Sequence, residues 1–338
     1  MAASNPLKII DISQTGPSTP AELLDALTTQ GFVFVDGHDF TQEEVDSLFD
    51  LSRAFFQLPS DYKQRYSIVG NTGYITFTKE NLDPAKKDDF KEGLNLSDLD
   101  LATGELNPAQ LIPDWIKDDD ARYELIKSSI RKLNSLNLKL LESIAVALEI
   151  EDSGECAGAQ WFTSRYDPKL KSGSTLRFLH YPVLNSNNSE GEIRAGAHTD
   201  YGSMTLLFQR RNQEGLEIYS PISKRWEKVP YVETENTGAA MAPPIVMNIG
   251  DLLSYWTAGL LKSTIHRVKF DASESRKEDR YSIVFFSHPS DETLLEPVPS
   301  PLIRARARSG RGVTKDEAKG EFITALEHLQ RKLAPTYQ

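Results

Sequence analysis

The stretch Gly196-Ala-His-Thr-Asp-Tyr-Gly202 holds the most informative pair of side chains in this sequence of 338 residues. If the stretch is extended, His198 and Asp200 are two positions apart and project to the same face of a strand. A third histidine from a neighbouring strand would complete a set of two histidines and one carboxylate, which leaves three coordination positions of a metal open. The motif alone is weak, because six histidines and 49 acidic residues produce such pairs by chance.

His266 is the best candidate for the third ligand. The polar stretch Asp271–Asp279 that follows it predicts a turn, and the run Arg280–Phe286 predicts the returning strand. Arg280 and Ser282 are two apart on that strand, so a guanidinium and a hydroxyl share a face and can hold a carboxylate. A metal with open positions beside a carboxylate anchor suits a chelating 2-oxo acid.

The charge and composition restrict the class of protein. Lys and Arg number 38 against 49 Asp and Glu, a net charge of −11, which disfavours a nucleic acid polymer or an anionic membrane as the main partner. No stretch reaches the roughly 18 apolar residues of a membrane span, and the first six residues do not resemble a signal peptide. We expect a cytoplasmic protein, a monomer or weak homodimer, acting on a small-molecule substrate. The single cysteine, Cys156, is interpreted as inert.

The first 150 residues show mainly helical periodicity, and the segments after them resemble short strands. Early strands are predicted at Leu7–Ile12 and Gly31–Val35, and helices at Ala21–Thr29, from the capping pair Thr41 and Glu44 to Leu58, and at Asp119–Glu149. The later strands are predicted at Trp161–Tyr166, Thr175–Tyr181, Met204–Gln209, Leu216–Ser220, Ile245–Ile249, Ser263–Phe270 and Tyr281–Ser287. Their number and spacing favour an antiparallel barrel or sandwich, so the fold class is α+β with a mainly β core.

The C-terminal part is predicted to be a loop followed by a helix. A capping pattern at Thr314 and Glu317 predicts the start of that helix. Its apolar side would carry Phe322, Leu326, Leu329 and Leu333. The basic run before it is interpreted as a solvated loop and comprises Arg304, Arg306, Arg308 and Arg311.

Taken in order, these motifs resemble the iron(II)- and 2-oxoglutarate-dependent dioxygenases of the isopenicillin N synthase-like group. The resemblance covers most of the chain and rests on agreement between independent segments. In addition to the His-Thr-Asp run, these segments are Ile9–Ile12, Gly31–Val35, Phe55–Pro59, Gly73-Tyr74, Leu176–Pro182, Asn248–Leu252, His266–Val268 and Arg280–Ser282.

The resemblance implies a double-stranded β-helix, a jelly-roll or cupin-like barrel braced by N-terminal, central and C-terminal helices. Residues 1–150 would form the N-terminal helical and strand region. Residues 151–300 would form the catalytic core with the Fe(II) and 2-oxoglutarate sites. Residues 301–338 would be a C-terminal loop and helix packed on that core.

The resemblance also implies the cofactors and the residues that bind them. The catalytic iron ligands would be His198, Asp200 and His266. The distal carboxylate of 2-oxoglutarate would be held by Arg280, Ser282 and Tyr181. Dioxygen would be the co-substrate and ascorbate the reductant, with release of succinate and carbon dioxide.

The identity of the organic substrate is the least determined part of this interpretation. The runs Leu176–Pro182 and Arg194–Gly202 resemble fungal thymine hydroxylase-type enzymes more than plant flavonoid enzymes. In that subgroup the counterparts of Arg177 and Phe286 approach the substrate, and Glu92 falls where relatives line the pocket. Each has an alternative role: Arg177 as the partner of a buried acid, Phe286 as a core side chain, Glu92 as a helix cap.

Several alternatives stay open from sequence alone. The substrate could be a nucleobase such as thymine, or a fungal secondary metabolite that is hydroxylated, desaturated or rearranged. An iron oxidase of the same fold without 2-oxoglutarate, a non-catalytic metal- or ligand-binding barrel and a zinc hydrolase are further interpretations. The segment Glu233–Pro244 is interpreted as an insertion, either shaping substrate entry or neutral. The remaining histidines are interpreted as non-ligands, with His288 placed in a surface turn; they are His38, His180, His288 and His328.

Overall fold

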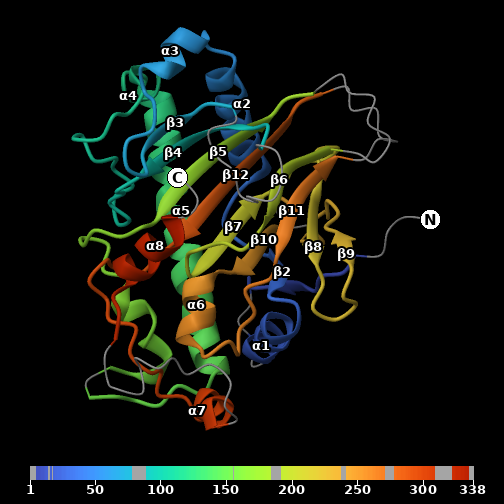
Figure 1. The fold of residues 1–338 in the computed structure, drawn as a ribbon, viewed down its shortest axis with the longest axis vertical. Helices are drawn as coiled ribbons and strands as arrows, with labels where there is room; N and C mark the ends of the chain where they lie inside the picture. The colour runs from blue at the N-terminus through green and yellow to red at the C-terminus, as the bar shows by residue number, and fades with distance from the viewer. Residues whose placement is uncertain are drawn as a thin grey trace.

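The fold is built from two sheets in the computed structural model (Figure 1). The structure describes all residues except 1–4, 14–15, 17, 78–88, 155, 184–191, 237–240, 271–277, 309–321 and 335–338. Among the described residues, the larger sheet has the order β1-β2-β10-β7-β12-β5-β4-β3 and the smaller one the order β6-β11-β8-β9. All neighbouring pairs are antiparallel except β1 with β2. This is the predicted double-stranded β-helix, and the fold class is confirmed.

The strands of the larger sheet are β1 (Ile9–Asp11), β2 (Phe32–Asp36), β3 (Gly73–Ile75), β4 (Glu92–Ser97), β5 (Thr175–Tyr181), β7 (Met204–Phe208), β10 (Ile245–Ile249) and β12 (Arg280–Ser287). Those of the smaller sheet are β6 (Glu192–His198), β8 (Leu216–Tyr219), β9 (Trp226–Lys228) and β11 (His266–Phe270). The helices are α1 (Thr19–Thr29), α2 (Gln42–Phe56), α3 (Ser60–Gln64), α4 (Asp114–Lys117), α5 (Asp120–Ala147), α6 (Asp251–Trp256), α7 (Pro301–Arg308) and α8 (Ala325–Leu333). None of the helices so described is long and apolar enough to cross a membrane.

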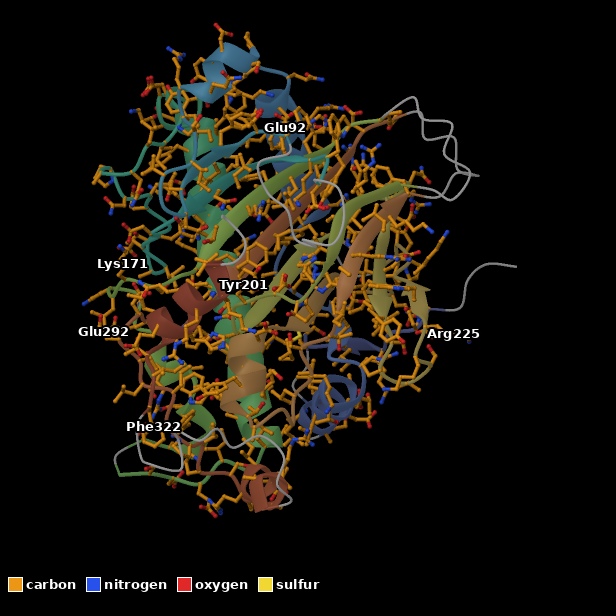
Figure 2. The ribbon with its side chains drawn as sticks, viewed as in Figure 1. Glu92, Lys171, Tyr201, Arg225, Glu292 and Phe322 are labelled. Atoms are coloured by element: carbon orange, nitrogen blue, oxygen red, sulfur yellow. The ribbon has the colours of Figure 1, made fainter. Side chains whose placement is uncertain are left out.

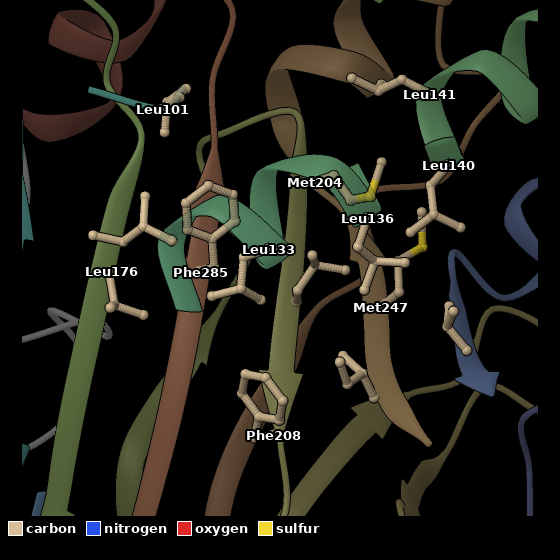
Figure 3. Packing of buried hydrophobic residues seen from close by; sticks show 14 of the residues in the cluster. Leu101, Leu133, Leu136, Leu140, Leu141, Leu176, Met204, Phe208, Met247 and Phe285 are labelled. Carbon is tan, nitrogen blue, oxygen red and sulfur yellow. The ribbon is translucent and has the colours of Figure 1, made fainter. Parts of the chain in front are cut away.

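The long helix α5 supports the outer face of the larger sheet, as its periodicity predicts. Asp119 caps its N-terminus by accepting a hydrogen bond from the Arg122 backbone. The leucines of its apolar face pack on side chains from four central strands (Figure 3). They are Leu133, Leu136, Leu140 and Leu141, facing Leu176, Met204, Phe208, Met247 and Phe285. Each fully buried side chain of this size contributes about 1.5–3 kcal/mol, so this contact holds the sheet in place.

Strict alternation along β12 divides its side chains between two environments. Tyr281, Ile283 and Phe285 belong to the cluster under the helices, whereas Val284 and Phe286 belong to the cluster between the sheets. The antiparallel partner β5 alternates in the same way, since Val284 lies opposite Arg177. Every second residue of both strands therefore faces the space between the sheets.

One predicted strand is wrong. Trp161–Tyr166 does not form a strand: it directly follows one 3-10 helix, Gly158–Gln160, and contains a second, Thr163–Arg165. Its aromatic rings pack on the Trp256 ring, with centroid distances of 5.1 Å for Trp161 and 5.5 Å for Phe162. Burial of aromatic rings here mimics the strand signal.

The prediction of a loop for the basic run is also wrong over its described part, because Pro301–Arg308 is the helix α7. Arg304 forms a two-pronged contact with Glu151, at 3.0 and 2.7 Å. Arg311 and the capping pair Thr314 and Glu317 lie outside the described residues. The closing helix α8 begins at Ala325, with a capping box between Thr324 and Glu327.

Candidate active site

Three predicted ligands converge at one edge of the smaller sheet. His198 ends β6, His266 begins β11, and the two lie opposite each other in register. Asp200 follows β6 by two residues, and one ligand atom from each of the three lies within 4.8 Å of the others. Asp200 Oδ1 is 3.5 Å from His266 Nε2 and 3.9 Å from His198 Nε2. Among the described residues, no other group of three histidine, cysteine or acidic side chains lies close enough together to hold a metal ion.

Hydrogen bonds fix which atom of each ligand faces the centre. Nδ1 of His198 donates to the Gly196 carbonyl at 2.7 Å and Nδ1 of His266 to the Thr264 carbonyl at 3.1 Å. A carbonyl only accepts, so Nδ1 carries a proton in both rings, and Nε2 is the atom that faces the centre. Such partners orient a ligating imidazole and raise its basicity.

The carboxylate of Asp200 is held in the same way through its other oxygen. Oδ2 accepts from Thr205 Oγ1 at 2.6 Å and from Asn248 Nδ2 at 2.7 Å. Oδ1 therefore faces the two Nε2 atoms. Two imidazoles and one carboxylate oxygen, all oriented, form the donor set that suits non-haem Fe(II).

Burial governs the protonation of these groups. Burial, with His266 nearby, lowers the pKa of His198 to about 4, so this ring is neutral at pH 7. Burial by itself would raise the pKa of Asp200, but His266 and His198 bring it below its usual range. Burial by itself would lower the pKa of His266, yet Asp200 outweighs it and the pKa lies above the ordinary value. A metal cation bound between these three side chains would balance the charge of Asp200 in place of the extra proton on His266.

A second polar group lies deeper between the sheets. Arg280 is opposite Tyr181 in register, with its guanidinium carbon 4.9 Å from the centre of the Tyr181 ring. Arg280 Nε donates to the Gln213 carbonyl at 2.8 Å. Ser282 is buried beside it, and its Oγ has no hydrogen-bond partner among the described residues. A buried hydroxyl without a partner costs about 1–3 kcal/mol, which a ligand oxygen would relieve, so these residues fit a carboxylate ligand.

One pocket between the sheets connects both groups. Its walls include the three candidate metal ligands and the candidate carboxylate anchor, together with both residues predicted to face the substrate. Those members are His198, Asp200, His266, Arg280, Ser282, Tyr181, Arg177 and Phe286. Tyr201 and Asn95 also line it.

Glu92 does not line this pocket, so the expectation that it faces the substrate is corrected. In β4 it lies opposite His180, and alternation turns its side chain to the outer face of the sheet. Its carboxylate accepts hydrogen bonds from Lys63 at 2.8 Å, from His180 at 2.7 Å and from the Tyr74 hydroxyl. Figure 2 labels Glu92 and Tyr201 in separate parts of the molecule.

The structure also shows site residues that the sequence did not reveal. Asn248 and Thr205 orient Asp200, and Gln213 holds Arg280, from positions 48, 5 and 67 residues away in the chain. Asn248 belongs to one of the motifs that carry the family resemblance, but nothing in the pattern shows its partner. His288 is 4% exposed and lines the pocket, so it does not lie in a surface turn.

The insertion Glu233–Pro244 packs away from the pocket in its described part. The Thr234 hydroxyl donates to Asp36 Oδ1 at 2.8 Å, and the Ala242 amide donates to the Phe40 carbonyl at 3.0 Å. Arg211 forms an ion pair with Glu233. No described residue of the insertion lines the pocket.

The fold and this donor set define a class: non-haem iron oxygenases with a 2-oxo acid site. The family described as the 2OG-Fe(II) oxygenase superfamily matches residues 172–289, and the family of N-terminal regions of non-haem dioxygenases in morphine synthesis matches residues 7–116. The chain belongs to the 2OG-Fe(II) oxygenase superfamily and is an Fe(II)- and 2-oxoglutarate-dependent dioxygenase.

Individual relatives match over nearly the whole chain. The UPF0676 protein C1494.01 of Schizosaccharomyces pombe is 32% identical over 97% of this chain and 92% of its own. The proline hydroxylase buaE of Petromyces alliaceus is 28% identical over 93% and 92%. A full-length Neurospora crassa protein, whose crystal structure was solved in complex with alpha-KG and thymine, is 26% identical over 97% and 96%, with a TM-score of 0.76.

Proposed function

We propose that the two polar groups of the pocket are the Fe(II) site and the 2-oxoglutarate anchor of this dioxygenase. The metal ligands in this proposal are His198, Asp200 and His266. The distal carboxylate of the co-substrate is held by Arg280, Ser282 and Tyr181. The observation that carries the proposal is that one pocket is lined by all six side chains.

Bound Fe(II), 2-oxoglutarate and dioxygen supply the oxidising chemistry, and ascorbate maintains the metal in its reduced state. The chain itself supplies orientation and a dry site. The buried partners of Asp200 and the two histidines fix three ligand atoms, while Arg280 sets the direction in which the oxo acid approaches them. The side chains of Leu207, Val268 and Val284 form apolar walls that exclude water from this part of the pocket.

The organic substrate in this proposal is a small planar molecule with a carbonyl group. Arg177 would donate to the carbonyl, and the ring of Phe286 would offer a stacking face. Both side chains lie in the pocket wall. A nucleobase such as thymine fits this description, and the Neurospora crassa structure, similar over nearly the whole chain, was solved with thymine.

A second candidate is oxidation of a different class of small molecule, including secondary metabolites. The relative from Petromyces alliaceus is a proline hydroxylase, so relatives of comparable identity act on substrates unlike a nucleobase. Hydroxylation, desaturation and ring rearrangement are all compatible with the pocket. An oxidase that omits 2-oxoglutarate is less favoured, because it would leave the buried Ser282 hydroxyl without a partner among the described residues.

A succinate-release screen tests these candidates. Purified protein with Fe(II), ascorbate and 2-oxoglutarate is offered pyrimidines, proline and other amino acids, and phenolic polyketides. Stimulation by pyrimidines supports the nucleobase assignment, and stimulation only by the other groups overturns it. The Asp200→Ala variant is the control, because all stimulated release should disappear with the metal ligand.

The proposal also divides the chain into the three regions expected from the sequence. Residues 1–150, 151–300 and 301–338 form the N-terminal region, the catalytic core and the C-terminal segment. The protein would be cytoplasmic and a monomer or weak homodimer, and sedimentation of the purified chain measures its oligomeric state directly.

A further inference from the structure

The pocket contains a buried histidine that the proposed chemistry does not use. His288 follows β12 by one residue and continues its inward alternation after Phe286. Its backbone is fixed by Ser174, whose hydroxyl accepts from the His288 amide at 3.0 Å and donates to the His288 carbonyl at 3.2 Å. The residue is 4% exposed and lines the pocket, so its imidazole can offer a hydrogen bond to a molecule bound there.

The His288 ring fits into space that two glycines leave open. A Cβ atom on Gly202 would lie 2.9 Å from His288 Nε2, and one on Gly173 would lie 3.1 Å from His288 Cγ. Both distances are shorter than ordinary contacts, so the ring occupies the space that side chains at these two positions would need. The imidazole is therefore positioned by the fold, as a group with a specific role should be.

The position of His288 relative to the candidate metal site follows from strand register. Phe286 lies opposite Thr205, whose hydroxyl binds Asp200. His288 is two residues further along, about 7 Å, while Arg280 is on the other side of Phe286, about 20 Å away along the strand. His288 thus lies on the side of the metal ligands opposite the carboxylate anchor, beyond the Phe286 ring.

An open cleft adjoins the pocket at this end. Four residues line both the pocket and the cleft: Asn71, Gly173, Leu329 and Leu333. Leu329 and Leu333 are four apart on α8 and share its inner face. Figure 1 shows α8 at the end of β5 and β12, and Figure 2 shows Tyr201 of the pocket and Lys171 of the cleft near this helix. A Cβ atom on Gly173 would lie 2.7 Å from Leu329 Cδ2, so the Leu329 side chain packs over this glycine and stands between the cleft and the pocket.

We propose that the organic substrate enters from this cleft, between α8 and Gly173, and that its outer part remains there, hydrogen-bonded to the His288 ring and packed on Leu329 and Leu333. This rests on the proposed function. The substrate class is then a planar head at the metal, such as a nucleobase, that carries a segment with a hydrogen-bonding group and an apolar part. A neutral imidazole offers one donor and one acceptor to that group. Burial lowers the pKa of His288 to about 3, so the ring is neutral at physiological pH.

Thiol labelling tests the entry route without a known substrate. His288→Cys is prepared in a Cys156→Ser background and treated with a small methanethiosulfonate reagent, with Fe(II) and 2-oxoglutarate present under nitrogen. Ser287→Cys is the matched control, since this neighbouring residue is buried and lines neither cavity. We expect His288→Cys to react at least about tenfold faster than the control, because access controls the reaction. Adding Leu329→Ala should raise the rate, and adding Leu329→Trp should lower it.

Equal rates for the two cysteines, or rates that ignore both changes at Leu329, would overturn the entry route. If His288→Cys does not fold by circular dichroism, Thr175→Cys in the same pocket replaces it. Labelling is independent of turnover, so its failure with intact Fe(II) and 2-oxoglutarate binding would refute this inference and leave the proposed function standing.

The hydrogen bond is tested on compounds that stimulate succinate release. His288→Leu should raise the Michaelis constant for the organic substrate about tenfold, the value of one hydrogen bond, and leave the Michaelis constant for the oxo acid unchanged. His288→Gln should recover part of the loss, because an amide also donates and accepts. An unchanged Michaelis constant for the organic substrate in His288→Leu would contradict the proposal.

Discussion

Replacing Ser282 by alanine should weaken 2-oxoglutarate binding without weakening the protein. The Ser282 hydroxyl is buried and has no partner among the described residues, so its removal deletes no described hydrogen bond of the unliganded fold. When the oxo acid is bound, this hydroxyl would donate to a carboxylate. A hydrogen bond to a charged group is worth about 1.5–3 kcal/mol, which corresponds to roughly 10- to 150-fold in affinity.

The assay is calorimetric titration of the Fe(II)-loaded protein with 2-oxoglutarate under nitrogen, together with thermal melting of the unliganded chain. Ser282→Ala should raise the dissociation constant by at least about tenfold and leave the melting temperature equal or slightly higher. Ser287→Ala is the matched control: the same change on the same strand, on the opposite face of the sheet. If both variants keep wild-type affinity, or if Ser282→Ala melts well below the control, the assignment of this hydroxyl is wrong.

Four further results are expected. Arg280→Ala should raise the Michaelis constant for the oxo acid about tenfold or more, with partial recovery in Arg280→Lys, because an ammonium lacks the planar fork; an unchanged constant would place the anchor elsewhere. Glu92→Gln should lower the free energy of unfolding by about 3 kcal/mol, since it leaves the buried ammonium of Lys63 without its counter-charge, with substrate preference unchanged; a changed preference would return Glu92 to the site. Asn248→Ala should weaken Fe(II) binding about 10- to 100-fold in an equilibrium titration, because Asp200 loses an orienting partner; wild-type affinity would contradict this. Burial lowers the pKa of His288 to about 3 from 6.5, so its unfolded form binds an extra proton below pH 6.5, and the stability lost from pH 7 to pH 5 in urea unfolding should be about 2 kcal/mol smaller in His288→Gln than in the wild type; an identical slope in the variant would refute this.

The arrangement of residues along one strand was open to prediction from sequence. Strand side chains alternate with period two, so Arg280 and Ser282 had to share a face once their strand was placed. His198 and Asp200 also converge, although Asp200 lies two residues beyond the end of β6. The same argument put Phe286 on the face of Ser282, and the structure brings all of them to one pocket. The roles of these residues stay predictions until ligands are bound.

Contacts between distant segments were beyond that argument. Glu92 was misplaced although its strand alternates: it shares a face with Leu94 and Leu96, but the pattern does not show that this face lies away from the pocket. Its partners on that face, Lys63 and His180, are 29 and 88 residues away. Local patterns hold no information on such partners. Helix α7, by contrast, was overlooked although its start signals are local: the Ser300 hydroxyl accepts a hydrogen bond from the Ile303 amide at 3.3 Å, and Pro301 occupies the first helical position.

The most direct test of the central assignment is a crystal structure of the protein grown under nitrogen with Fe(II) and 2-oxoglutarate, with anomalous diffraction recorded at the iron edge. The account predicts one strong iron peak bounded by His198 Nε2, His266 Nε2 and Asp200 Oδ1, with the distal carboxylate of the oxo acid on Arg280 and Ser282. Iron bound elsewhere, or an oxo acid that does not reach Arg280, would contradict it.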